Sequence, residues 1–197
     1  MRKKSHISVA KYLLNSNGME YLNDHKKSFY IGSILPDCVP SFITRRHCIE
    51  DTIEILKKEI DKITIDYDIN KGLTPYFCRH LGVITHYVAD YFTFPHNSIY
   101  PGNIKDHCAY EEDLKHAMRA YVKSDESQRI RERNGLFKDS DEIIAFIHSV
   151  HEEYLQLIIQ VKLDCMYIVE LCHKVVDAIL QLFELELHKY NSLAVAF

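Results

Sequence analysis

The sequence is poor in features that mark several large classes of protein. Its 197 residues include only six glycines and five prolines and no low-complexity tract, which leaves little room for long linkers or for an all-β fold rich in tight turns. No stretch approaches the roughly 20 apolar residues that a membrane-spanning helix needs. Polar residues interrupt segment 5–14, so it does not have the apolar core of a secretion signal. We therefore expect a cytoplasmic protein without a transmembrane segment, with secretion by an unusual route left open.

The sequence also lacks paired cysteines and a positive net charge, and both absences narrow the range of possible functions. The six cysteines form no C-x-x-C pair and no disulfide-framework spacing, so we interpret them as reduced thiols that act as small buried hydrophobic side chains. The formal net charge of −4 argues against a broad basic surface, and no stable complex with nucleic acid is expected. A nuclease stays possible, because a metal cluster would bring its own positive charge to a phosphate.

Helical periodicity, by contrast, runs through almost the whole chain. Apolar residues recur at three- and four-residue steps over residues 53–63, 143–159 and 163–188, and Glu59 falls on the wet side of the first segment. Residues 76–92 are apolar on most faces, which predicts a central buried helix. Asp139-x-x-Glu142 resembles a capping box ahead of the helix at 143–159. The prediction is an all-α, single-domain multi-helix bundle over residues 1–197, with ligands within 6–111 and a helical scaffold over 112–197.

Twelve histidines are a high number for this length, and several stand beside carboxylates between Asp37 and Glu111. His86 and Asp90 are four residues apart on the apolar helix, and His107 and Glu111 repeat that spacing in the next one. Four residues are about one helical turn, so each pair projects from one face and can grip a divalent cation. An unpaired Asp90 would be costly on so apolar a helix. The alternative is that Asp90 caps a neighbouring helix while His86 bonds a backbone carbonyl.

Other candidate ligands are weaker when each is taken alone. His96 lies in a loop before the second pair, and two histidines with a carboxylate form a familiar catalytic zinc set. Asp37 and His47 also suit a turn cap and a helix start. His6, near the start of the chain, is weaker still. Glu112 is interpreted as part of a charged outer face, although a rotated helix would exchange it with its neighbour. The histidines of the C-terminal half are interpreted as surface residues.

Taken together, these residues resemble a known family. The segments that carry the resemblance, with His47 and His96 between them, are Ile31-Gly-Ser-Ile-Leu-Pro-Asp37, Gly82-Val-Ile-Thr-His86-Tyr-Val-Ala-Asp90 and His107-x-x-Tyr-Glu111. This pattern is similar to the bacterial zinc-dependent phospholipase C family and spans residues 6–111. That family shares an all-helical fold and a trinuclear zinc site with the single-strand-specific zinc nucleases of fungi and plants.

The resemblance implies a specific set of zinc ligands. The first ion would be held by Asp37, His47, His86 and Asp90, the second by His96, His107 and Glu111, and the third by His6 with the bridging Asp90. In the secreted enzymes an N-terminal Trp completes the third site, whereas this sequence has no Trp and begins five residues before His6. Two zinc ions are therefore expected and the third is left open. By resemblance, Asp37 is also the candidate catalytic residue, as ligand and as base that orients the attacking water.

The implied activity is zinc-dependent hydrolysis of a phosphoester substrate. A phospholipase C-like phosphodiesterase, acting on phospholipid, is the leading hypothesis. The alternatives are a nuclease or small-molecule phosphodiesterase on the same fold, and a non-catalytic metal-binding protein. Low basic charge favours a lipid or a small ester over long nucleic acid. A cytoplasmic location weakens the lipid hypothesis, because a free phospholipase would attack the membrane of its own cell. The oligomeric state is not readable from the sequence.

Overall fold

The computed structural model describes residues 1–39, 46–131, 135 and 137–194 of the chain. Over these residues it contains seven α-helices and no β-strand, which confirms the all-α prediction. They are α1 (Lys3–Asn15), α2 (Lys26–Ile34), α4 (Ile49–Asp61), α5 (Pro75–Tyr91), α6 (Ile104–Tyr121), α7 (Ser140–Leu155) and α8 (Val161–Ala194). Short 3₁₀ turns join several of them, and η3 (Phe94–His96) follows α5 directly.

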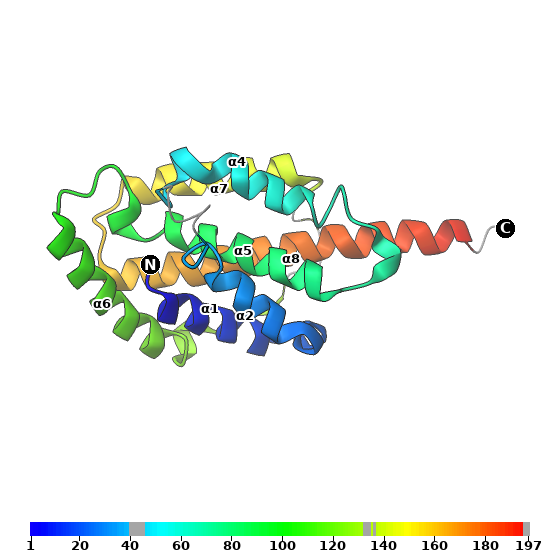
Figure 1. Cartoon of the computed structure of the whole chain (residues 1–197), viewed down its shortest axis with the longest axis horizontal. Coiled ribbons are helices and arrows are strands. Elements are labelled where there is room, and N and C mark those ends of the chain that lie inside the picture. Colours follow the sequence, from blue (N-terminus) through cyan, green and yellow to red (C-terminus); the bar gives the residue numbers. More distant parts are fainter. Residues whose placement is uncertain (40–45, 132–134, 136, 195–197) are drawn as a thin grey trace.

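Helix α5 is the centre of the bundle, as its apolar sequence predicts. It packs against α2, α4, α8 and α1, and every residue from 81 to 91 is buried. Figure 1 shows α4 and α7 on one side of α5. Helices α1, α2 and α6 lie on the other side, and α8 runs along the length of the bundle. Because α5 is enclosed on nearly all sides, its polar side chains can face only the protein interior.

The ends of the helices next to the candidate ligands have clear local causes. The Thr74 side chain accepts a hydrogen bond from the N–H of Phe77, and Pro75 occupies the first turn of α5, where a missing N–H costs nothing. Asn103 opens α6 with a complete capping box that includes Asp106. Together these caps fix where α5 and α6 begin, and hence which faces carry the His and carboxylate pairs.

Boundaries in the C-terminal half differ from the prediction. Helix α7 begins at Ser140 and ends at Leu155, whereas periodicity indicated 143–159, and α8 runs to Ala194 instead of residue 188. The predicted capping box is half formed. Asp139 accepts from the N–H of Glu142, but the Glu142 carboxylate accepts from Lys138, one residue too early.

Helices α2 and α5 touch backbone to backbone through two glycines. A Cβ atom on Gly82 would lie 2.3 Å from the carbonyl oxygen of Phe29, and one on Gly32 would lie 2.0 Å from that of Arg79. Neither distance is compatible with a side chain, so only glycine permits the contact. The close approach brings the end of α2, and Asp37 just beyond it, against the middle of α5.

Several polar residues predicted at the surface are buried. Glu59 is only 5% exposed and contacts His80 and Lys62, so the wet side assigned to it is wrong. Burial of the apolar stripe of α4 carries Glu59 inward with it, and the Lys62 ammonium and the contact with His80 compensate its charge. His151 and His173 of the C-terminal half are also buried, which corrects the prediction that they lie on helix surfaces.

The six cysteines are free thiols, and four of them are buried, as predicted. Cys38 and Cys108 are exposed, so the buried assignment is wrong for these two. Among the described residues, no helix is both long enough and apolar enough to cross a membrane.

Candidate metal centre

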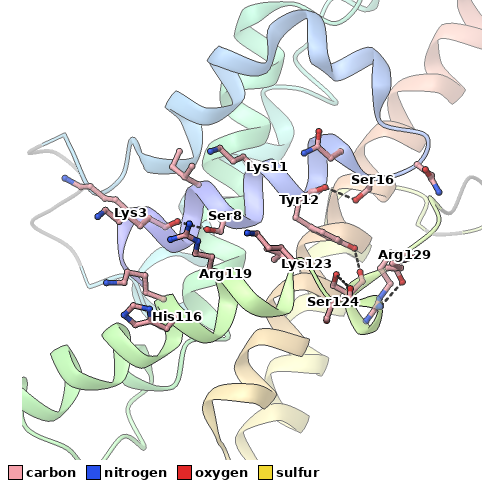
Figure 2. Close-up of a pocket in the computed structure, with 18 of the residues that line it drawn as sticks. Lys3, Ser8, Lys11, Tyr12, Ser16, His116, Arg119, Lys123, Ser124 and Arg129 are labelled. Atoms are coloured by element: carbon pink, nitrogen blue, oxygen red, sulfur yellow. Dashed lines mark hydrogen bonds between the residues drawn. The ribbon is translucent and has the colours of Figure 1, made fainter.

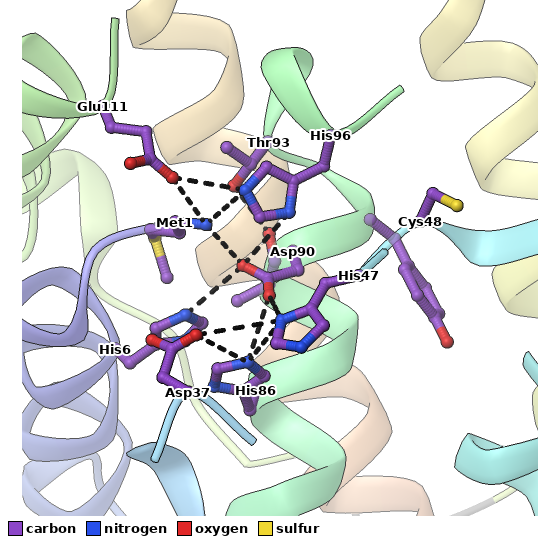
Figure 3. Close-up of polar contacts among 12 residues, drawn as sticks. Met1, His6, Asp37, His47, Cys48, His86, Asp90, Thr93, His96 and Glu111 are labelled. Atoms are coloured by element: carbon purple, nitrogen blue, oxygen red, sulfur yellow. Dashed lines mark hydrogen bonds and ion pairs between the residues drawn. The ribbon is translucent and has the colours of Figure 1, made fainter. Parts of the chain in front are cut away.

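The structure brings all eight candidate ligands into one cluster, most of which is visible in Figure 3. His6 comes from α1, Asp37 from the turn after α2, His47 from the segment before α4, His86 and Asp90 from α5, His96 from η3, and His107 and Glu111 from α6. Three groups have ligand atoms all within 4.8 Å of one another: His6, Asp37 and His86; His47, His86 and Asp90; and His96, His107 and Glu111. Residues far apart in sequence therefore meet at three neighbouring positions.

Asp90 is the hub of this cluster. Its carboxylate is fully buried, and its two oxygens face different groups. Oδ2 lies 2.9 Å from His47 Nδ1 and 3.1 Å from His86 Nε2, while Oδ1 lies 3.3 Å from His6 Nε2 and 2.7 Å from the α-amino nitrogen of Met1. Burial alone would raise the pKa of Asp90, but the Met1 ammonium and the surrounding histidines hold it well below its usual range.

His86 has an orientation that points to a cation. Its Nδ1 lies 2.9 Å from the carbonyl oxygen of Ser33, and a carbonyl only accepts, so Nδ1 carries the ring proton. Nε2 therefore points into the cluster, toward Asp90 Oδ2 at 3.1 Å and His47 Nδ1 at 3.2 Å. With Nδ1 turned to the Ser33 carbonyl, Nε2 is the ring atom that can bind a metal ion beside the Asp90 carboxylate. His86 thus does bond a backbone carbonyl, as the alternative interpretation held, while Asp90 faces the cluster.

The second helix pair forms the other end of the cluster. Glu111 Oε1 lies 3.3 Å from His96 Nε2 and 3.4 Å from His107 Nε2. The Met1 ammonium lies among them, 2.7 Å from His96 Nε2 and 3.2 Å from Glu111 Oε1, so these atoms already attract a cation. Burial would raise the pKa of Glu111, but the hydrogen bond from His96 and the ammonium charge lower it to about 2. The carboxylate is therefore ionised and available to a metal at any physiological pH.

Glu111, and not Glu112, is the carboxylate that faces the cluster. Glu112 lies one residue further around α6 and pairs with Arg2, Lys115 and His116 on the outer surface. This agrees with its interpretation as part of a charged outer face.

Asp164, which the sequence prediction did not include, holds the loop that carries His96. The N–H of Phe94 donates to its Oδ2 at 2.9 Å, Tyr110 to the same oxygen at 3.0 Å, and Tyr154 to Oδ1 at 2.8 Å. Burial raises the pKa of Asp164 to about 6, although these three donors favour its charged form. An aspartate in the first turn of an apolar helix is the one signal that could have indicated this role.

A second contact from the C-terminal half supports the same loop. The Asn97 side chain donates to the carbonyls of Tyr91 and Thr93, and its Oδ1 lies 2.7 Å from His151 Nε2. Residues after 111 therefore position a candidate ligand as well as forming the scaffold predicted for them.

The cluster opens to the surface through a pocket of about 510 Å³. Its walls combine cluster residues with cationic ones, and they are Met1, Asp37, His96, Glu111, Arg2, Lys3, Lys4 and Lys115. A negatively charged ester would therefore meet positive side chains on its way to the cluster.

The donor set suits zinc. Imidazole nitrogens and carboxylate oxygens are its preferred ligands besides thiolate. Three buried ring nitrogens of the cluster have no hydrogen-bond partner among the described residues: His6 Nε2, His47 Nε2 and His96 Nδ1. The first and the last lie 3.3 and 3.7 Å from Asp90 Oδ1. The Ser33 carbonyl on His86 is the kind of outer contact that orients a metal-bound imidazole.

An all-helical bundle around such a cluster is the arrangement of a metal-binding protein. Residues 5–160 match the family described as zinc dependent phospholipase C, which is more than half of the chain. The chain therefore belongs to the zinc-dependent phospholipase C family and is a zinc-dependent hydrolase. The match reaches through α7, well beyond the segment 6–111 that carried the resemblance in sequence. No curated protein and no solved structure matched the chain.

Proposed function

We propose that this protein hydrolyses phosphodiesters of the phospholipase C type, with zinc ions held in the cluster. The observation that carries the proposal is the convergence of eight His, Asp and Glu side chains on one cluster, in which His86, oriented by the Ser33 carbonyl, directs Nε2 at a buried carboxylate oxygen 3.1 Å away. The first ion would be held by Asp37, His47, His86 and Asp90, and the second by His96, His107 and Glu111. His6 and Asp90 Oδ1 mark a third position, beside the Met1 amino group.

Asp37 is the residue we propose as base. It is the carboxylate of the first ligand set that also lines the surface pocket, and its side chain is 21% exposed, whereas Asp90 is fully buried. Its Oδ1 lies 3.8 Å from His47 Nδ1 and 3.9 Å from His86 Nε2. It therefore stands where a water molecule from the pocket would meet the cluster, and it can orient that water and accept its proton.

The remaining groups divide the work between binding and positioning. Zinc, when bound, would polarise the phosphoryl oxygens and lower the pKa of a coordinated water toward about 7. Arg2, Lys3 and Lys4 at the pocket would bind the negative charge of the ester. Asp164, acting through the backbone of η3, would hold His96 in place. The buried faces of α5 keep bulk water away from the inner ligands.

Metal content and substrate range test this proposal together. The protein should be purified without chelators and should carry two or three zinc ions per chain. It should then be assayed on a generic phosphodiester, a phosphocholine ester, single-stranded nucleic acid and a phosphomonoester. Turnover of the diesters that a chelator abolishes and zinc restores would support the proposal. A chain that binds no metal under any condition would overturn it.

A matched pair of variants tests the ligand assignment. Asp90→Asn should lose most bound zinc and activity, because the bridging charge at the hub disappears. Glu112→Gln also replaces a carboxylate by an amide, but on the outer surface of α6, where Glu112 pairs with Arg2. This variant should retain its zinc and its activity. Zinc content and diesterase rate measure the difference, and equal losses in the two variants would show that the ligands are misassigned.

A further inference from the structure

A second and larger cavity, of about 1340 Å³, lies between α1 and α6 (Figure 2). Among its described lining residues there is no Asp or Glu, although the chain as a whole has 28 acidic and 24 basic residues. Five exposed cations line it, namely Lys3, Lys4, Lys11, Arg119 and Lys123. We call this cavity the α1–α6 groove.

These five cations lack counter-ions among the described residues. No described carboxylate lies within ion-pair distance of any of them, whereas Lys115 and Arg129, which also line the groove, pair with Glu112 and Glu170. Like charges gathered around one groove repel one another. A bound anion would remove this repulsion, so the groove has the electrostatics of a binding site.

The cations are arranged in rows and not around a point. Lys115 and Arg119 lie one turn apart on α6, and Lys123 follows at the same spacing in the turn beyond the end of the helix at Tyr121. Lys4 and Lys11 are about two turns apart on α1, along roughly 10 Å. A compact anion would engage only part of such rows. A chain that carries a negative charge at regular intervals would engage them all.

The groove has charge but little surface for stacking bases. Among its described lining residues there is no Phe or Trp, and the one tyrosine, Tyr12, is half-buried and donates its hydroxyl proton to the carbonyl of Ser127. Single-strand binders that read bases use exposed aromatic rings as stacking platforms. Recognition here would therefore depend on phosphate charge. The hollow shape also fits a strand better than the flat surface of a bilayer.

We propose that the α1–α6 groove binds a linear phosphate polyanion, the chemistry shared by the backbone of single-stranded nucleic acid and by inorganic polyphosphate. Lys3, Lys4 and Lys115 line both this groove and the pocket of the metal centre, so a bound strand would lead toward the cluster. Only that last point rests on the proposed function; the binding itself does not. The expectation of no stable nucleic-acid complex followed from the net charge of the chain. A net charge does not register that unpaired cations are gathered in one groove.

Fluorescence anisotropy of a labelled oligothymidylate, with chelator-treated full-length protein, measures binding without hydrolysis. Unlabelled polyphosphate as competitor distinguishes the two sources of phosphate. Binding should weaken as salt rises, since each phosphate contact releases counter-ions.

The groove variant neutralises three unpaired cations. The control neutralises three exposed lysines outside the groove, so the net charge is the same. The groove variant is Lys11→Gln, Arg119→Gln, Lys123→Gln, and the control is Lys26→Gln, Lys27→Gln, Lys58→Gln.

The groove variant should lose at least tenfold in affinity, and its salt slope should fall by about two units, at about 0.7 per lost contact with a single strand. The control should bind as the wild type does. Equal losses in both variants, no binding of either polymer, or binding only to vesicles of anionic phospholipid would overturn the proposal. If the protein purified without chelators carries no zinc and hydrolyses no diester but still binds the polymer, the groove proposal stands and the proposed hydrolase is rejected.

Discussion

Replacing Gly82 by alanine tests how closely the fold and the metal centre depend on each other. The new Cβ atom would lie 2.3 Å from the carbonyl oxygen of Phe29 and 2.8 Å from the nitrogen of Ser33, both in the backbone of α2. Ordinary contact begins near 3.4 Å, so α2 would have to move away from α5 by roughly 1 Å. No side-chain rotation can relieve this clash, because backbone atoms make it.

Two effects of opposite sign set the change in stability. Alanine is better than glycine in a helix by about 1 kcal/mol, whereas overpacking a tight interface costs about 1–3 kcal/mol, and more where backbone must shift. We expect a net loss of about 2 kcal/mol in the free energy of unfolding. The same movement would break the 2.9 Å hydrogen bond from His86 Nδ1 to Ser33. Losing such an outer contact typically lowers metal affinity by about 10–100-fold.

Urea unfolding of chelator-treated protein measures the first effect, and competition with a chromophoric zinc chelator measures the second. Gly102→Ala is the control, because the atoms nearest to the new Cβ belong to the ring of Tyr100, a side chain that can turn away, and not to the backbone. The reasoning fails if Gly82→Ala is as stable as the wild type. If stability is lost but zinc affinity is unchanged, only the link between the helix contact and the metal centre is rejected.

Two further predictions concern buried carboxylates and pH. The folded state keeps a proton on Asp164, whose pKa is about 6, after the unfolded chain has released it, so this group lowers stability as pH rises from about 4 to about 6, by up to ~3 kcal/mol. Asp164→Asn should remove that slope from urea unfolding curves, and an unchanged slope would contradict the assignment. For Glu59, hydrogen bonds from His80 and Lys62 outweigh burial and lower its pKa, so its stabilisation is present above the unfolded value and is lost in acid. Glu59→Gln should cost about 1–2 kcal/mol near neutral pH and less below pH 4; equal cost at both would refute it.

Local pattern explains what could be predicted from the sequence. The one-turn spacing of His86 and Asp90 needs only helix geometry to place both side chains on one face. The burial of α5 follows from its apolar residues on nearly every face. Helix boundaries were less accurate because caps, such as that of α7, add or remove a few residues that periodicity does not register.

Contacts between distant segments explain what could not be predicted. Asp164 reaches η3 only because α8 packs beside α6, and His151 reaches Asn97 only because of where α7 lies. The burial of Glu59 depends partly on His80, which another helix supplies. The groove between α1 and α6 is invisible in a net charge, since it exists only once two rows of cations face each other.

Helix α5 supplies both the middle of the hydrophobic core and two inner ligands of the cluster, so substitutions there change folding and chemistry together. The residues around the pocket mouth, among them Lys3, Lys4 and Lys115, come from α1 and α6 and carry little of the core. Selection can therefore alter these positions at small cost in stability. Substrate preference can therefore diverge between related chains while the metal centre stays the same. Laboratory evolution toward a new ester should begin with the residues at the mouth of the pocket.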